Sequence, residues 1–208
     1  DWAIFWVICG IILRIILMIA SNWRIDFDEA FNGLLAFKIM RGEWVLFTPP
    51  EVVGGTGTPY LLALIFSFWG ASAVTFRLVS MIWCVLYILT TGWSAKLAFG
   101  RSVAILAMGF ASLAPPYMIF VGMKLWSSYI ETILLGNLLL ICIHYLLIAS
   151  GPRQGYLMVI AGFVAGVMFW LTWLGFYYFV PVVMVLIWRG HRILLKWGWL
   201  GIISFFVG

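Results

Sequence analysis

Long apolar runs separated by short polar segments make up most of the chain. A helix needs about 20 residues to cross the hydrocarbon core of a bilayer, so this pattern predicts transmembrane helices. We expect spans at about residues 2–20, 76–97, 103–121, 126–148, 156–171, 175–188 and 193–208. Together they would form a single transmembrane domain over residues 1–208. We expect this domain to be incomplete, because the last apolar run reaches the end of the sequence.

One long polar stretch, at residues 22–75, follows the first span. Asp26, with Glu29 three residues later, has the spacing of a capping box, which predicts a helix at about 27–41. A second apolar segment at about 59–69 would rise only about 16 Å, too little to cross a bilayer. The predicted fold class is therefore all-α, a polytopic transmembrane helix bundle with two juxtamembrane interfacial helices in the first extracytoplasmic loop.

Composition and charge agree with a membrane location. Hydrophobic residues make up 65% of the chain and charged residues 9%, so it has more apolar surface than a soluble domain of this size can bury. The net charge of +5 comes from scattered basic residues, so no nucleic-acid partner is expected.

The distribution of charges along the chain predicts its orientation. The loops at about 96–101, 151–154 and 189–196 contain six Lys or Arg and no acid, whereas six of the seven acids fall on the other side of the alternating spans. If the segment at 59–69 were a further span, Lys96 and Arg101 would lie outside the cytoplasm and Glu131 inside, against this bias. The positive-inside pattern thus places the long loop outside the cytoplasm, in a multi-pass protein of a bacterial inner or plasma membrane.

Acids near the outer ends of the spans are candidates for chemistry. Asp28 and Glu29 lie in the first turn of the predicted loop helix, where the simplest interpretation is that they stabilise its N-terminus through the helix dipole. The alternative is a carboxylate held at the membrane interface as a general base or a cation ligand. Glu131 is either a structural partner of Lys124 or Arg77, or part of a polar cavity. Arg77 itself either extends to the interface or binds an anion.

Other polar positions have structural interpretations. Arg14, inside the first span, is expected to extend its guanidinium toward the cytoplasmic edge. The three cysteines have no CxxC spacing and the two histidines have no ligand spacing, so no metal site is predicted. The glycine-rich stretch at 51–59 lacks a phosphate-loop pattern, and we expect a flexible joint there in preference to a mobile substrate-binding loop.

Several short motifs occur in a characteristic order: Asp28-Glu29, Gly42-Glu43-Trp44, Thr58-Pro59-Tyr60, Phe68-Trp69-Gly70, Arg77-Leu78-Val79-Ser80 and Lys124…Tyr129-Ile130-Glu131. In this order the chain resembles the N-terminal portion of the membrane-embedded glycosyltransferases of the C superfold, especially the protein mannosyltransferase and aminoarabinose-transferase-like group. The resemblance covers about residues 23–131 by motif and the whole chain by order of spans. Where that family often has a Lys after the fifth span, this chain has Thr172-Trp173, so no lipid-phosphate contact is carried over there.

The resemblance implies transfer of a sugar from a polyprenyl-phosphate donor to an acceptor outside the cytoplasm, with inversion at the anomeric carbon. Asp28 matches the catalytic base of the family, Glu29 would assist or position it, and Glu131 would shape the sugar or acceptor pocket. Arg77 or Lys124 would neutralise the leaving phosphate. No cofactor is implied, and a requirement for a divalent metal is left open. The implied partners are the lipid-linked sugar donor and membrane lipid.

Two other classes of function stay open at this point. A non-catalytic membrane subunit, associated with other membrane subunits, would have Asp28 and Glu131 outside any common cavity. A transporter is disfavoured, because the spans contain few polar residues and no inverted repeat is visible in the sequence.

Overall fold

A computed structural model of the protein describes residues 2–48, 54–125 and 129–208. The described chain is all-α, as the sequence predicted, and within those ranges it contains no β-strand, only an isolated bridge between Phe47 and Gly55. The first part of the glycine-rich stretch, at 51–53, and the start of the span expected at 126–148 lie outside the described residues.

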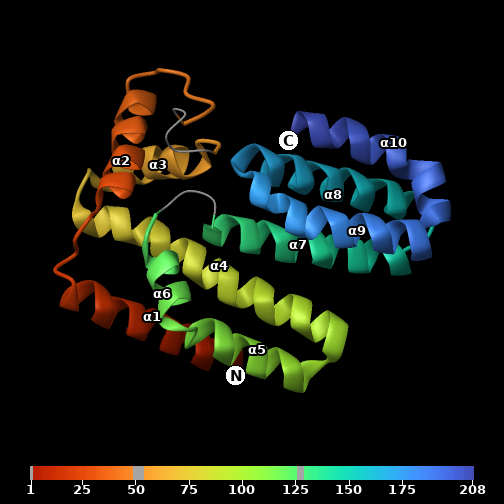
Figure 1. The fold of residues 1–208 in the computed structure, drawn as a ribbon, viewed down its shortest axis with the longest axis horizontal. Coiled ribbons are helices and arrows are strands. Elements are labelled where there is room, and N and C mark those ends of the chain that lie inside the picture. Colours follow the sequence, from red (N-terminus) through yellow and green to blue (C-terminus); the bar gives the residue numbers. More distant parts are fainter. Residues whose placement is uncertain (1, 49–53, 126–128) are drawn as a thin grey trace. The chain divides into compact units, whose positions relative to one another are not determined.

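Ten α-helices and one short 3-10 helix follow one another along the described chain (Figure 1). They are α1 (Trp2–Ala20), α2 (Phe27–Met40), α3 (Gly57–Trp69), α4 (Ala73–Phe99), α5 (Arg101–Ser112), α6 (Pro116–Met123), α7 (Tyr129–Ile148), α8 (Pro152–Leu171), η1 (Trp173–Gly175), α9 (Phe176–Arg189) and α10 (His191–Val207).

Four of these helices, α1, α4, α7 and α8, are long and apolar enough to cross a bilayer. The continuous span expected at 103–121 is broken in the structure, because the chain bends by 72° between α5 and α6. α3 is apolar but has only 13 residues, a rise of about 20 Å, and the helical segment Trp173–Arg189 is also shorter than a span. These helices identify the chain as a helical membrane protein.

The helices pack into two compact units, Asp1–Glu131 and Thr132–Gly208. In the first unit α4 is the central helix, with contacts to α1, α3, α5 and α6. α2 and α3 pack on each other beside the start of α4, whereas α5 begins at the far end of α4 (Figure 1). The core under α2 consists of Ala36, Leu62, Ala63, Ile65, Phe66, Phe76, Val79 and Leu125.

The expected position of the Arg14 side chain was wrong. Arg14 does not extend to an edge of the membrane, because it is 1% exposed and donates hydrogen bonds to the carbonyl oxygens of Gly10, at 3.1 Å, and Ser112, at 3.0 Å. The break between α5 and α6 explains the second contact. Proline has no N–H, so Pro116 leaves the Ser112 carbonyl without its helical donor, and the Arg14 guanidinium takes that place.

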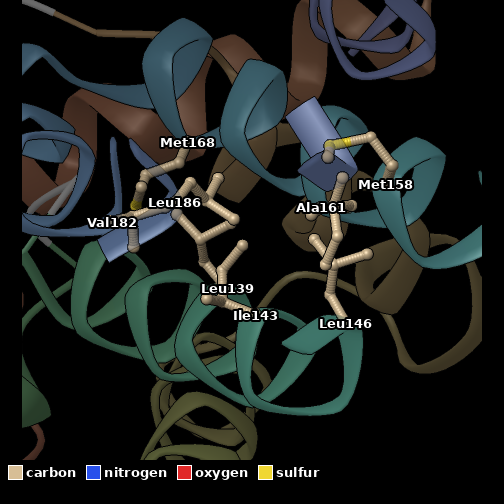
Figure 2. Close-up of a cluster of buried hydrophobic side chains, with 9 residues drawn as sticks. Leu139, Ile143, Leu146, Met158, Ala161, Met168, Val182 and Leu186 are labelled. Atoms are coloured by element: carbon tan, nitrogen blue, oxygen red, sulfur yellow. The ribbon is translucent and has the colours of Figure 1, made fainter. Parts of the chain in front are cut away.

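The second unit is built on close contact between α8 and α10. A Cβ atom on Gly162 would overlap the carbonyl oxygen of Gly201, and one on Gly166 would overlap that of Phe205. Glycines spaced by four residues let two helix backbones approach in this way. Figure 2 shows the adjoining core, formed by Leu139, Ile143 and Leu146 of α7, Met158, Ala161 and Met168 of α8, and Val182 and Leu186 of α9.

Candidate functional site

The N-terminus of α2 is closed by the capping box that the sequence predicted. The Asp26 carboxylate accepts a hydrogen bond from the backbone N–H of Glu29 at 3.0 Å, and the Glu29 carboxylate accepts one from the N–H of Asp26 at 3.1 Å. This reciprocal bonding satisfies donors that the start of a helix otherwise leaves without partners. Both acids are thereby fixed relative to the backbone of α2.

Glu29 has no exposed surface, and its carboxylate lies at the centre of a polar network. It forms an ion pair with both terminal nitrogens of the Arg77 guanidinium, and it accepts from Lys124 Nζ at 3.1 Å and from the backbone N–H of Leu125 at 3.0 Å. A buried charge is tolerated when it is paired and hydrogen bonded in this way. Glu29 therefore links α2 to α4 and to the segment that follows α6.

Arg77, in the second turn of α4, is 4% exposed and its terminal nitrogens are fully used. Besides Glu29, it donates to the carbonyl oxygen of Met123 at 2.8 Å and to that of Arg24. The rigid fork of a guanidinium suits such a junction, because it holds several acceptors in one plane. Arg77 connects α4, the end of α6 and the segment before α2, and its predicted contact with a leaving phosphate stays a prediction.

Lys124 is the more accessible cation of the network. Its Nζ lies 3.0 Å from Asp26 and 3.1 Å from Glu29, its side chain is 15% exposed, and it lies 5.5 Å from the ring centroid of Phe120. The residue caps the end of α6 with an extended backbone, so it belongs to no helix shared with Glu131. Glu29, which neither expected pair included, is the acid that both Lys124 and Arg77 contact.

Two buried hydrogen bonds extend the network around α3 and α7. Thr58, in the first turn of α3, donates to the Glu131 carboxylate at 2.5 Å, and both residues are 2% exposed. Asn32 donates to the carbonyl oxygen of Leu125 at 2.6 Å. Sequence reasoning did not single out Asn32 or Thr58. For Asn32 a signal was present, because it lies one helical turn after Glu29 and shares its face of α2.

Asp28 lies apart from this network. Its side chain is exposed, and among the described residues it has no ion pair and no side-chain hydrogen bond. Successive residues of a helix point about 100° apart, so burying Glu29 turns Asp28 toward the surface. Phe27 and Leu34 of the same helix are also exposed, at 82% and 60%, so α2 has apolar side chains on its outer surface as well as in the core.

The candidate site thus has two parts: a buried, charge-paired support and one exposed carboxylate above it. Within the described ranges, no group of three or more His, Cys, Asp or Glu side chains is arranged to hold a metal ion. Chemically, the arrangement offers an exposed proton acceptor at Asp28, on a helix whose first turn is anchored by Glu29, and a partly accessible cation at Lys124.

Comparisons of the chain with protein-family models, with curated proteins and with solved structures found no match. The fold and the site therefore define the class: a polytopic helical membrane protein whose first loop carries a helix fixed by a buried ion-pair network.

Proposed function

We propose that the chain is the N-terminal part of a glycosyltransferase that moves a sugar from a polyprenyl-phosphate donor to an acceptor on the extracytoplasmic side of the membrane. The observation that carries the proposal is that two adjacent acids of α2 differ in their surroundings. Glu29 is buried and holds α2 in place, whereas Asp28 is exposed on the same helix turn. Further support comes from the ordered motifs and from the charge bias of the loops, which predicts that α2 lies outside the cytoplasm.

In the proposed reaction Asp28 is the general base. Its carboxylate takes the proton of an acceptor hydroxyl while the hydroxyl oxygen attacks the anomeric carbon of the sugar. The bond between that carbon and the phosphate oxygen breaks, the configuration inverts, and polyprenyl phosphate leaves with the bonding electron pair. Lys124 is the cation placed to stabilise the charge on this leaving group, because it is the partly exposed one.

The placement of α2 fits a donor that is itself a lipid. The donor keeps its phosphosugar at the membrane interface, and the exposed Phe27 and Leu34 give α2 an apolar side that suits the same depth. A base contributes most when its position is fixed before the substrate binds. The contacts of Glu29 with Arg77 and Lys124 supply that fixed position.

The test is transfer by the full-length protein in proteoliposomes, with radiolabelled polyprenyl-phosphate mannose and polyprenyl-phosphate aminoarabinose as donors. Release of polyprenyl phosphate is the readout, because this product is the same whichever acceptor hydroxyl is used. Asp28→Asn should lower turnover at least about 100-fold, the usual contribution of a general base. Glu43→Gln is the matched control, because it removes another exposed acid of the same predicted loop. Retained turnover in Asp28→Asn, or no turnover by the wild type with either donor, would contradict the proposal.

A non-catalytic membrane subunit is the second candidate, and one observation favours it. The hydrogen bonds of the Glu29 carboxylate and of the Arg77 terminal nitrogens join α2, α4 and the end of α6, so a packing role accounts for both residues. This alternative predicts that Asp28→Asn changes neither turnover nor stability of the complex in which the chain is found.

A further inference from the structure

A cavity of about 460 Å³ lies at the end of α4 that is remote from α2 and α3. Residues at the starts of α1 and α5 and at the end of α4 line it. Its volume is within the range of about 300–1,000 Å³ that small-molecule sites in proteins occupy. The acids Asp26, Asp28, Glu29 and Glu131 are at the other end of the first unit, so this cavity is separate from the candidate site.

The charged lining of the cavity is basic. Lys96, in the last turn of α4, and Arg101, the first residue of α5, both line it, and both side chains are exposed. Among the described residues neither cation contacts a carboxylate, and no acid lines the cavity. Two unpaired cations on one cavity therefore offer a site for an anionic group.

The remaining lining places the cavity at a membrane surface. Trp2 and Trp93 both line it, and tryptophan is enriched where the hydrocarbon core meets the headgroups. α4 has 27 residues and is about 40 Å long, which exceeds the hydrocarbon core of about 30 Å. A helix of this length extends beyond the hydrocarbon core, and the charged end that bears Lys96 suits the headgroup region.

We propose that this cavity binds the phosphodiester headgroup of an anionic membrane phospholipid. Lys96 and Arg101 contact the phosphate, while Trp2 and Trp93 lie beside the glycerol and the first carbons of the acyl chains. A basic pocket between transmembrane helices recognises anionic headgroups by this chemistry. A lipid is the occupant that fits, because the apolar side chains of Leu89, Ile105 and Met108 line the same cavity as the two cations.

The experiment measures lipid retention by native mass spectrometry of the full-length protein, titrated in detergent with phosphatidylglycerol or with phosphatidylcholine. Each cation is worth about fivefold in affinity for an anionic headgroup, so the double variant Lys96→Gln/Arg101→Gln should bind phosphatidylglycerol about 25-fold more weakly. The variant Lys96→Arg/Arg101→Lys keeps both charges and should stay within about threefold of the wild type. Both residues are exposed, so neither variant removes a buried contact.

A matched control removes two exposed cations of the same predicted membrane side that do not line the cavity, through Arg153→Gln/Arg192→Gln. It should bind phosphatidylglycerol as the wild type does.

A second control is the single variant Asp1→Asn, because Asp1 precedes Trp2 in the sequence and lies outside the described residues. This variant should bind phosphatidylglycerol as tightly as the wild type or more tightly. Three results would overturn the proposal. The control variant could weaken phosphatidylglycerol binding as much as the Lys96/Arg101 variant does, or the wild type could retain phosphatidylcholine as well as phosphatidylglycerol. Inorganic phosphate could also displace the bound lipid at the same concentration.

Discussion

Replacing Glu29 by Gln is expected to destabilise the first unit more than any other single change on α2. The N–H groups of Asp26 and Leu125 donate to different oxygens of the Glu29 carboxylate, so the single amide oxygen of Gln can accept from only one of them. The substitution also removes the charge that pairs with Arg77. Arg77 is 4% exposed, so its guanidinium would stay buried without a counter-ion. Leaving one partner of a buried ion pair alone costs about 3–5 kcal/mol.

This cost is large compared with the total free energy of unfolding of a domain, about 5–15 kcal/mol. The neighbouring Asp28→Asn variant is the matched control, because it removes an exposed acid without a partner among the described residues. Surface changes of that kind stay within about 0.5 kcal/mol. The loss of unfolding free energy should therefore be at least about 3 kcal/mol larger for Glu29→Gln than for Asp28→Asn.

The assay is reversible unfolding in mixed micelles with increasing SDS, followed by far-ultraviolet circular dichroism. A double-mutant cycle isolates the pair: Arg77→Met alone leaves Glu29 buried without that cation, and Glu29→Gln/Arg77→Met removes both charges. Neutral replacement of a whole buried pair is often nearly neutral, so the double variant should recover at least about 2 kcal/mol relative to the sum of the single costs. Additive costs, or equal stability of Glu29→Gln and Asp28→Asn, would refute the reasoning.

Three further predictions concern packing, orientation and the leaving group. Gly162→Ala should weaken the contact between α8 and α10 by about 1–3 kcal/mol in the same unfolding assay, whereas Gly198→Ala, whose Cβ meets only a side-chain atom of its own helix at 3.8 Å, should not destabilise. A cysteine at Glu43 should react with a membrane-impermeant maleimide in intact cells, and one at Ser102 only after permeabilisation; the opposite pattern would invert the predicted topology. Lys124→Gln should lower kcat/KM for the polyprenyl-phosphate donor about tenfold, as expected from the loss of one charge-assisted hydrogen bond to the leaving phosphate, and an unchanged kcat/KM would remove Lys124 from the proposed reaction.

The features that could be predicted from the sequence are those that depend on nearby residues. Apolar runs of about span length predicted the all-α membrane fold, and the spacing of Asp26 and Glu29 predicted both the start of α2 and its capping box. α2 begins at Phe27 and ends at Met40, close to the expected bounds of 27–41. Capping and helix length are local properties, so one stretch of sequence contains the information.

The partners of the buried charges could not be predicted, because the contacts join distant positions. Glu29 meets Arg77 across 48 residues and Lys124 across 95. Lys124 was a candidate partner of Glu131, but it follows α6 with an extended backbone and is not part of α7. For Arg14 the deciding contact was with the carbonyl of Ser112, which becomes available only because the chain bends before α6.

The charge balance of the network bears on the roles proposed for Asp28 and Lys124. Arg77 and Lys124 supply two positive charges, and Asp26 and Glu29 supply two negative ones, so the connected group is neutral without Asp28. A further buried carboxylate there would be uncompensated, whereas an exposed one is stabilised by water. The negative charge of Asp28 is then free to attract a proton, but it also repels a phosphate. Because Arg77 is enclosed and Lys124 is partly exposed, a phosphate group that reaches this network would share Lys124 with Asp26. The proposed base therefore lies on α2 and the proposed phosphate contact lies at the end of α6, two segments that Glu29 links.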